Sequence, residues 1–192
     1  MPQGSALGPL LFLIYVNAMP SIVQYGRLLQ FANDTTLTCS GDTHNDVQWQ
    51  LQHDLRSLHS WINSSKMRLN ITKSSLMWFK SKQGCGVPHP PVFINGHLLQ
   101  EVEEQKYLGI MFDSKLQWGS YINYICKKAS YYLYLLSSHR KSLTFDILKM
   151  LAESLILSRF DYALPVWGPP LQQCQVSRLQ HLQNRAVRVK II

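Results

Sequence analysis

The chain has 192 residues, of which 46% are hydrophobic and 16% are charged. This composition suits one folded domain, or one domain with a small appendage, and excludes a disordered tail. No run approaches the roughly 18 uncharged apolar residues of a membrane span, and no signal-peptide pattern is present, so we expect an intracellular protein, in the nucleus or the cytoplasm. The four cysteines form no C-x-x-C pair and the seven histidines are dispersed, which argues against disulfides and a structural metal.

The net charge of +8 is unevenly placed along the chain. Residues 1–114 contain 8 Lys or Arg against 8 Asp or Glu, whereas residues 115–192 contain 11 against 3. The whole excess therefore lies in the second part. A basic surface of this kind suits contact with a phosphate backbone, although a merely solubilising surface would give the same count.

The first part of the chain predicts mixed helices and strands. An apolar run over residues 6–19 predicts a buried helix, with its glycine and proline in the first turns. Residues 27–31 and 35–39 are prone to form strands and flank an Asn-Asp turn, so we expect a β-hairpin. An amphipathic helix should then begin near Asp42 or Thr43, where the side chain can serve as N-cap.

Shorter elements are expected next. Residues 76–79 predict a strand, and the Gly- and Pro-rich residues 83–91 predict a loop. Residues 92–99 contain Asn-Gly at their centre, which is typical of a hairpin with a type I′ turn. Residues 106–112 predict a further single strand.

From about residue 117 the pattern predicts helices alone, with a boundary to the mixed part near residue 115. The apolar positions of the three expected helices are Ile122, Ile125, Ala129, Tyr132 and Leu136; then Ile147, Met150, Leu151, Ser154 and Leu155, after a cap at Thr144; and last Leu179, Leu182, Ala186 and Val189. The fold class we expect is therefore α/β, of the α+β type.

Five segments in this order resemble the reverse transcriptases of non-LTR, LINE-type retrotransposons. Residues 2–12 (PQGSALGPLLF) closely resemble motif B, and residues 31–36 (FANDTT) resemble the motif C box, which usually reads F-A-D-D in that family. Residues 61–73 are similar to motif D, residues 107–110 to the primer-grip strand, and residues 182–188 to a segment that follows the polymerase core. The resemblance spans nearly the whole chain.

The resemblance implies a truncated polymerase palm with an antiparallel hairpin over residues 1–115. A basic, all-helical, thumb-like region would follow over residues 116–192. The partners it implies are an RNA template and a DNA primer-template duplex. A further implied partner is a fingers and palm segment that precedes motif B in the family.

The resemblance also implies nucleotidyl transfer with two Mg²⁺ ions, held by carboxylates from motif A and from the Asp pair of motif C. Here the first Asp of that pair is Asn33, so Asp34 alone would remain as a metal ligand. Motif A would lie upstream of residue 1. We therefore expect Mg²⁺ not to bind productively and the polymerase to be defective. Without the resemblance, Asn33 and Asp34 would be a simple β-turn.

Other site residues follow from the same resemblance. Gln3, Gly4 and Ser5 would line the nucleotide and template side of the palm, with Phe31 and Ala32 beside the motif C pair. The first three could equally form a helix-entry turn capped by Ser5.

Lys73 would lie near the phosphates of the incoming nucleotide. The alternative is a solvated lysine after a helix.

Basic side chains of the helical part would contact the nucleic-acid backbone, or would form the charged outer face of packed helices. They are Lys127, Lys128, Arg178, Arg185 and Arg188. Tyrosines in the same part could stack on bases, but we expect them to pack in the core and at its boundary. They are Tyr121, Tyr124, Tyr131, Tyr132 and Tyr134.

Three functional hypotheses remain open. The first is a catalytically defective reverse-transcriptase fragment. The second is a non-catalytic module that binds nucleic acid through its basic half. The third is a decayed open reading frame without a selected role.

Overall fold

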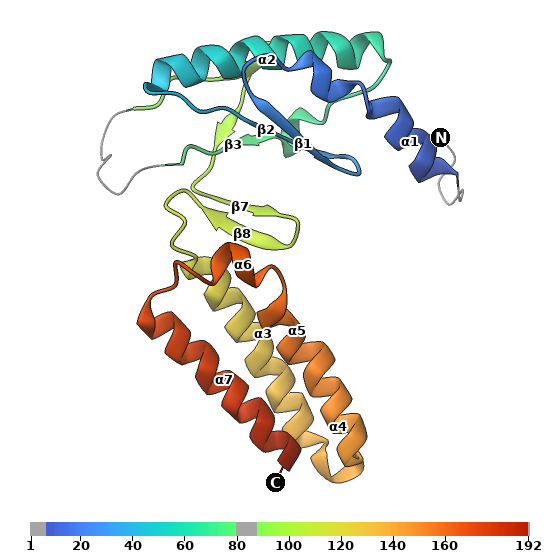
Figure 1. Ribbon diagram of the computed structural model, residues 1–192, viewed down its shortest axis with the longest axis vertical. Coiled ribbons are helices and arrows are strands. Elements are labelled where there is room, and N and C mark those ends of the chain that lie inside the picture. Colours follow the sequence, from blue (N-terminus) through green and yellow to red (C-terminus); the bar gives the residue numbers. More distant parts are fainter. Residues whose placement is uncertain (1–6, 80–87, 192) are drawn as a thin grey trace. The chain divides into compact units, whose positions relative to one another are not determined.

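The computed structural model describes residues 7–79 and 88–191 (Figure 1). Helices and small two-stranded sheets give an α+β fold, as the sequence predicts. The chain forms two compact units: the first holds the described residues up to Trp78 and from 88 to Val102, and the second runs from Glu103 onward. Within the described ranges no helix is long and apolar enough to cross a membrane.

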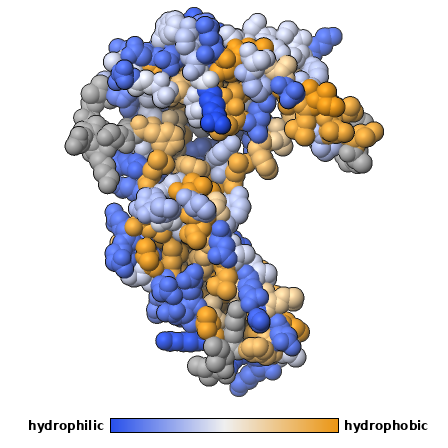
Figure 2. All heavy atoms as spheres, viewed as in Figure 1, coloured by the Kyte–Doolittle hydropathy of each residue, from blue (hydrophilic) through white to orange (hydrophobic). Residues whose placement is uncertain are grey.

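The first unit begins with helix α1 (Gly8–Val16), followed by the short 3₁₀ helix η1 (Met19–Ile22). The predicted helix is confirmed, but its predicted burial is wrong, because Leu10 and Ile14 are 55% and 66% exposed. This segment is apolar around its whole circumference, and only the side that carries Val16 packs against α2. The remainder forms an apolar surface, drawn in orange over α1 in Figure 2.

The predicted hairpin is confirmed as strands β1 (Arg27–Phe31) and β2 (Asp34–Thr38). The strands are antiparallel, and Phe31 pairs with Asp34 at the end of the ladder. The connecting loop is therefore two residues long, one fewer than predicted. Its first residue, Ala32, has a φ of 51°, in the left-handed region that suits tight hairpin loops.

Helix α2 (His44–Ser64) also follows its prediction. Thr43 is the N-cap, and its hydroxyl accepts a hydrogen bond from the backbone N–H of Asp46 at 3.1 Å. The same hydroxyl donates to the Asp46 carboxylate at 2.6 Å, so two hydrogen bonds join the cap to the first turn and one of its orphan N–H groups is satisfied. Leu51 and Leu58 on its apolar face are buried.

A buried carboxylate fastens α2 to the hairpin. Asp54 has no exposed surface, and its two oxygens accept hydrogen bonds from the backbone N–H groups of Gln24 (3.0 Å), Tyr25 (3.1 Å) and Gly26 (2.7 Å). Burial by itself would raise the pKa of Asp54, but the three N–H donors, helped by His53, outweigh it and hold the pKa below 3.8. The start of β1 is thus fixed on the helix.

The rest of the first unit consists of short pairings. Strand β3 (Ser75–Leu76) pairs in parallel with β6 (Gln100–Glu101), so the predicted strand over 76–79 reduces to its first residue. Strands β4 (Phe93–Ile94) and β5 (His97–Leu98) form the predicted hairpin. Both turn residues between them, Asn95 and Gly96, have positive φ, which confirms the type I′ turn. Most of the predicted loop 83–91 lies outside the described residues.

The second unit opens with a hairpin where the sequence predicts one strand. Strands β7 (Glu104–Tyr107) and β8 (Ile110–Asp113) are antiparallel, with φ of 47° at Leu108 and 85° at Gly109 in the turn. The single-strand prediction for 106–112 is wrong because leucine rarely adopts positive φ, which left Gly109 as the only turn signal.

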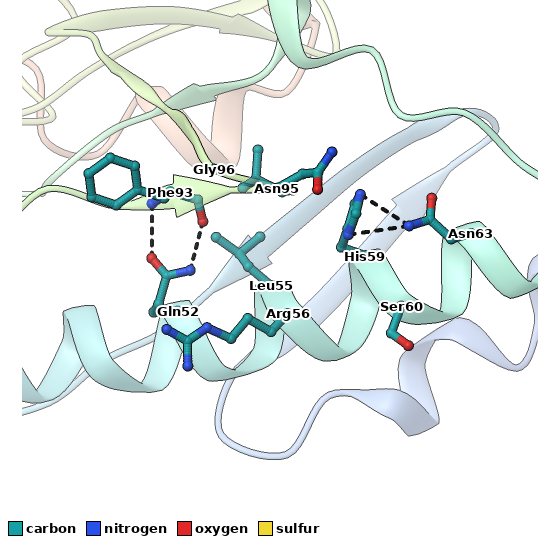
Figure 3. A pocket seen from close by; sticks show the side chains of 10 residues that line it. Gln52, Leu55, Arg56, His59, Ser60, Asn63, Phe93, Asn95 and Gly96 are labelled. Atoms are coloured by element: carbon teal, nitrogen blue, oxygen red, sulfur yellow. Dashed lines mark hydrogen bonds between the residues drawn. The ribbon is translucent and has the colours of Figure 1, made fainter.

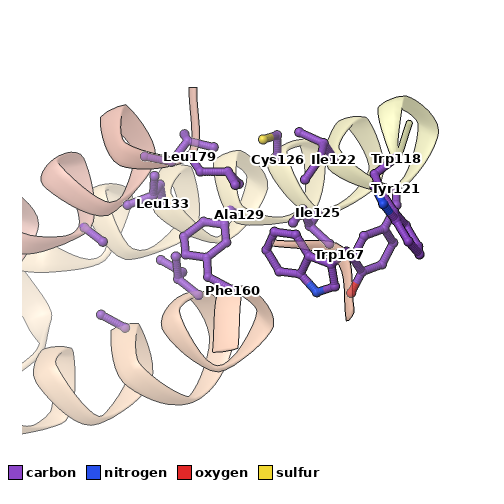
Figure 4. Packing of buried hydrophobic residues seen from close by; sticks show 14 of the residues in the cluster. Trp118, Tyr121, Ile122, Ile125, Cys126, Ala129, Leu133, Phe160, Trp167 and Leu179 are labelled. Atoms are coloured by element: carbon purple, nitrogen blue, oxygen red, sulfur yellow. The ribbon is translucent and has the colours of Figure 1, made fainter. Parts of the chain in front are cut away.

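The helices of the second unit form its core. In chain order they are α3 (Gly119–Ser138), the 3₁₀ helix η3 (Arg140–Ser142), α4 (Phe145–Ala152), the π-helical turn η4 (Glu153–Leu157), α5 (Ser158–Asp161), α6 (Leu164–Trp167) and α7 (Gln173–Ile191). Ala129 and Trp167 have no exposed surface, and Ile122 and Leu133 keep 1% each. Figure 4 shows these side chains gathered along one face of α3.

The predicted apolar face is right for α3 and for the first three positions on α7, Leu179, Leu182 and Ala186, whereas the side chain of Val189 lies outside the described residues. It is wrong in part for α4, where Leu151 and Leu155 are partly buried against the core as predicted. Ile147 and Met150 are exposed, whereas Leu148, Ala152 and Ile156 are buried. Two sets of apolar residues share helical spacing in this segment, so periodicity alone could not separate them.

The Asp54 linkage makes the first prediction. Asp54→Asn should lower the free energy of unfolding by about 2 kcal/mol at neutral pH, since it removes the charge-assisted hydrogen bonds that the buried carboxylate accepts from backbone N–H groups. Because the folded pKa lies below 3.8, the contribution of Asp54 is present above that pH and is lost as the pH falls through the folded pKa. Urea unfolding of both chains at neutral and acidic pH would measure this difference.

The exposed Asp42 offers a matched control, because Asp42→Asn should leave the stability almost unchanged. An Asp54→Asn penalty that stays the same at neutral pH and at low pH would contradict the ionised, hydrogen-bonded carboxylate.

Candidate functional site

The tip of the β1–β2 hairpin presents four expected site residues to solvent. Asn33 lies in the loop and Asp34 is the first residue of β2, and both are exposed, as are Ala32 and Phe31, the last at 61%. The tip thus offers one carboxylate and one neighbouring amide oxygen. Two Mg²⁺ ions need more anionic oxygens than this tip has. The described residues contain no cluster of three or more His, Cys, Asp or Glu that could hold a metal.

Lys73 is the other expected palm residue within the described ranges, and it is not joined to this tip. Lys73 is exposed at the end of the short 3₁₀ helix η2 (Ile71–Lys73). No hydrogen bond or ion pair links it to Asp34 in the part of the chain that the structure describes. Gln3, Gly4 and Ser5 lie outside the described residues.

A groove that sequence patterns did not predict lies between α2 and the β4–β5 hairpin (Figure 3). Gln52, one of its lining residues, joins the helix to the hairpin: its side-chain amide accepts a hydrogen bond from the Phe93 N–H at 2.9 Å and donates one to the Phe93 carbonyl at 2.7 Å. The groove has a volume of about 570 Å³ and is lined by donors such as Arg56 and Asn63, with no Asp or Glu among its lining residues. Its chemistry suits small anions more than cations.

The basic residues of the second unit come together on two neighbouring helices. Lys127 and Lys128 on α3 are exposed, as are Arg178, Arg185 and Arg188 on α7. Neither helix contains an Asp or a Glu, so no acidic side chain on them offsets this charge.

Two contacts show how α7 lies on α3. The Gln175 amide donates to the carbonyl of Gln117 at 3.1 Å, and Arg178 donates to the side chain of Asn123. The two helices therefore run in the same direction. Asn123 lies one turn before Lys127, which places the basic stripe of α7 beside the exposed side of α3.

The tyrosines of α3 divide into two groups. Tyr121 is 2% exposed and Tyr132 is half-buried, as expected. The core prediction is wrong for Tyr124, Tyr131 and Tyr134, which are 39%, 56% and 68% exposed. The reason is geometric, since these three lie on the side of α3 opposite to the buried face.

Comparisons with known proteins agree with the motifs. A family model described as reverse transcriptase (RNA-dependent DNA polymerase) matches residues 1–112. The probable RNA-directed DNA polymerases of transposons X-element and BS of Drosophila melanogaster are 28% and 27% identical over 98% of this chain. The RNA-directed DNA polymerase of the mobile element jockey is 25% identical over the same share. The chain spans about a fifth of the length of these relatives. No solved structure matches it significantly.

Proposed function

The chain belongs to the reverse transcriptase (RNA-dependent DNA polymerase) family, as a domain of the non-LTR retrotransposon kind, and from this premise we propose that it holds RNA template and DNA primer-template. In this proposal residues 1–115 are a partial polymerase palm and residues 116–192 a thumb-like region. The observation that carries it is the exposed basic surface of α3 and α7, two helices without any acidic residue.

The chemistry of that surface fits a phosphate backbone. Arginine and lysine that neutralise phosphates release condensed counterions, which gives affinity without reading the sequence. Arg185 and Arg188 lie a turn apart on α7, and the buried Leu182 and Ala186 beside them hold the helix against the core. A rigid helix then presents the guanidinium groups in a fixed row.

The hairpin tip supports a weakened catalytic role. In the family, carboxylates at this place and in motif A would hold Mg²⁺, which supplies the Lewis acid for nucleotidyl transfer. Asn33 gives an uncharged amide oxygen where the family has a carboxylate, and Asp34 keeps the one charge. The remaining ligands would come from a polymerase segment upstream of motif B. Nucleotidyl transfer is therefore impaired, and nucleic-acid binding without catalysis is the alternative function that Asn33 favours.

Metal binding at the tip gives the second prediction. Asn33→Asp should bind Mn²⁺ more tightly than the unchanged chain, because a second carboxylate adds charge and a hard oxygen ligand. Asp34→Ala should bind Mn²⁺ more weakly than the unchanged chain, because it removes the carboxylate. Electron paramagnetic resonance of bound Mn²⁺ measures all three. Equal binding by the three chains would remove the tip from any metal site.

The same three chains should be compared in templated primer extension with Mg²⁺ and with Mn²⁺. We expect no appreciable incorporation by the unchanged chain or by Asp34→Ala. Robust incorporation by the unchanged chain that Asp34→Ala abolishes would contradict impaired catalysis.

Charge reversal on α7 gives the third prediction. The double change Arg185→Glu and Arg188→Glu should weaken binding to RNA and to duplex DNA, and should reduce the slope of log affinity against log salt by about 2 for duplex DNA. Fluorescence anisotropy at several salt concentrations measures both quantities.

The double change Lys106→Glu and Lys115→Glu is the matched control, since it alters the net charge equally at exposed positions outside both helices. If both double changes weaken binding to the same extent, the α7 stripe is not the contact surface and only the net charge matters.

A further inference from the structure

One face of α3 combines exposed aromatic rings with lysines. We call it the tyrosine–lysine face, and it consists of Tyr124, Lys127, Lys128, Tyr131 and Tyr134. Each of these residues lies three or four positions from the next one along the same side of the helix, so all five share one face. The residues extend over about 15 Å of helix axis, at 1.5 Å per residue.

Packing among the residues that the structure describes does not account for this face. The core side of α3 is already filled by Ile122, Ile125, Ala129, Leu133 and Leu136, each at most 4% exposed. Tyr124, Tyr131 and Tyr134 nevertheless keep 39%, 56% and 68% of their surface in water. Exposed apolar surface that is grouped and not scattered is typical of an interaction site.

Next to this face, the guanidinium group of Arg159 lies over the ring of Tyr132. Tyr131 lies edge-on to Tyr132 with ring centroids 5.5 Å apart. The guanidinium carbon of Arg159 lies 5.1 Å from the centre of the Tyr132 ring, and its Nη2 donates to the Tyr132 hydroxyl at 3.4 Å. Positive charge therefore borders the rings at Arg159 as well as at the two lysines.

We propose that the tyrosine–lysine face binds unpaired nucleic acid, with bases stacking on Tyr124, Tyr131 and Tyr134 and with Lys127 and Lys128 contacting phosphates. The inference rests on the proposed function and deepens it by naming the form of the nucleic acid. Rings interleaved with cations, on a helix without acids, complement a strand that exposes both bases and phosphates.

A paired duplex would use this face poorly. Its bases are stacked inside, so only the lysines would find partners and the three rings would lie against sugar and phosphate. An unpaired strand can turn its bases outward onto the rings.

The test compares two triple variants of the full chain at Tyr124, Tyr131 and Tyr134. Changing all three to Ala removes the rings, whereas changing all three to Phe keeps them and serves as the matched control. Anisotropy with labelled oligouridylate should show about fivefold weaker binding, or more, for each ring lost, and near-normal binding for the Phe variant. The salt slope should not change, because no phosphate contact is removed.

Binding to a duplex of equal length separates the outcomes, and the three single Ala variants repeat the test with smaller changes. The Ala variant should lose oligouridylate affinity while duplex affinity stays close to that of the unchanged chain. Equal losses on both ligands, or no loss on either, would overturn the stacking proposal and leave the α7 contact standing. If the unchanged chain binds neither ligand, both the proposed function and this inference are overturned.

Discussion

The burial of one face of α3 is the interaction on which the second unit depends. Ala129, with no exposed surface, lies midway along this face, and Ile122 and Leu133 lie almost as deep one or two turns to either side. A small residue at the centre lets neighbouring helices approach, and the larger ones fill the gaps between them. Because this face must point inward, the opposite face must point to water. The tyrosines and lysines of that opposite face are thus displayed by the core itself.

In the first unit a single charge has the comparable role. Asp54 is fully buried, and its carboxylate oxygens accept hydrogen bonds from three consecutive backbone N–H groups, from Gln24 to Gly26. Those groups lead directly into β1, so the position of the hairpin on α2 depends on this carboxylate. Residue 26 also lies close to the end of β2, where only a glycine fits, because a Cβ there would lie 2.7 Å from the Cys39 sulfur. Because the hairpin is fixed on α2 at this end, the exposed Asn33 and Asp34 at its other end are positioned as well.

The sequence predicted correctly those features that depend on only a few neighbouring residues. The Asn95-Gly96 turn and the Thr43 cap both depend on one or two residues with specific backbone or hydrogen-bonding needs. Prediction failed at Leu108, where the β7–β8 turn places a leucine at positive φ. It failed again for the burial of α1 and for the inward face of α4, since burial depends on which partners are present.

The candidate sites show the same division. The two strand-prone runs correctly predicted the hairpin that carries Asn33 and Asp34, because the strands and their turn are contiguous in sequence. The groove beside Gln52 depends on residues about forty positions apart and left no contiguous pattern. The exposed tyrosines could have been recognised from the predicted stripe of α3, which already put Tyr124 and Tyr131 on its far side. Because aromatic residues usually pack in cores, the sequence prediction placed these tyrosines there and not on the exposed side.

The central claim is that nucleic acid lies on the outer faces of α3 and α7. The most direct measurement is photochemical crosslinking of the full chain to 4-thiouridine-containing RNA, followed by mass spectrometry to locate the crosslinked peptides. Crosslinks should concentrate in residues 119–138 and 173–191, with the tyrosine–lysine face prominent among them. Crosslinks confined to peptides of the first unit would contradict it.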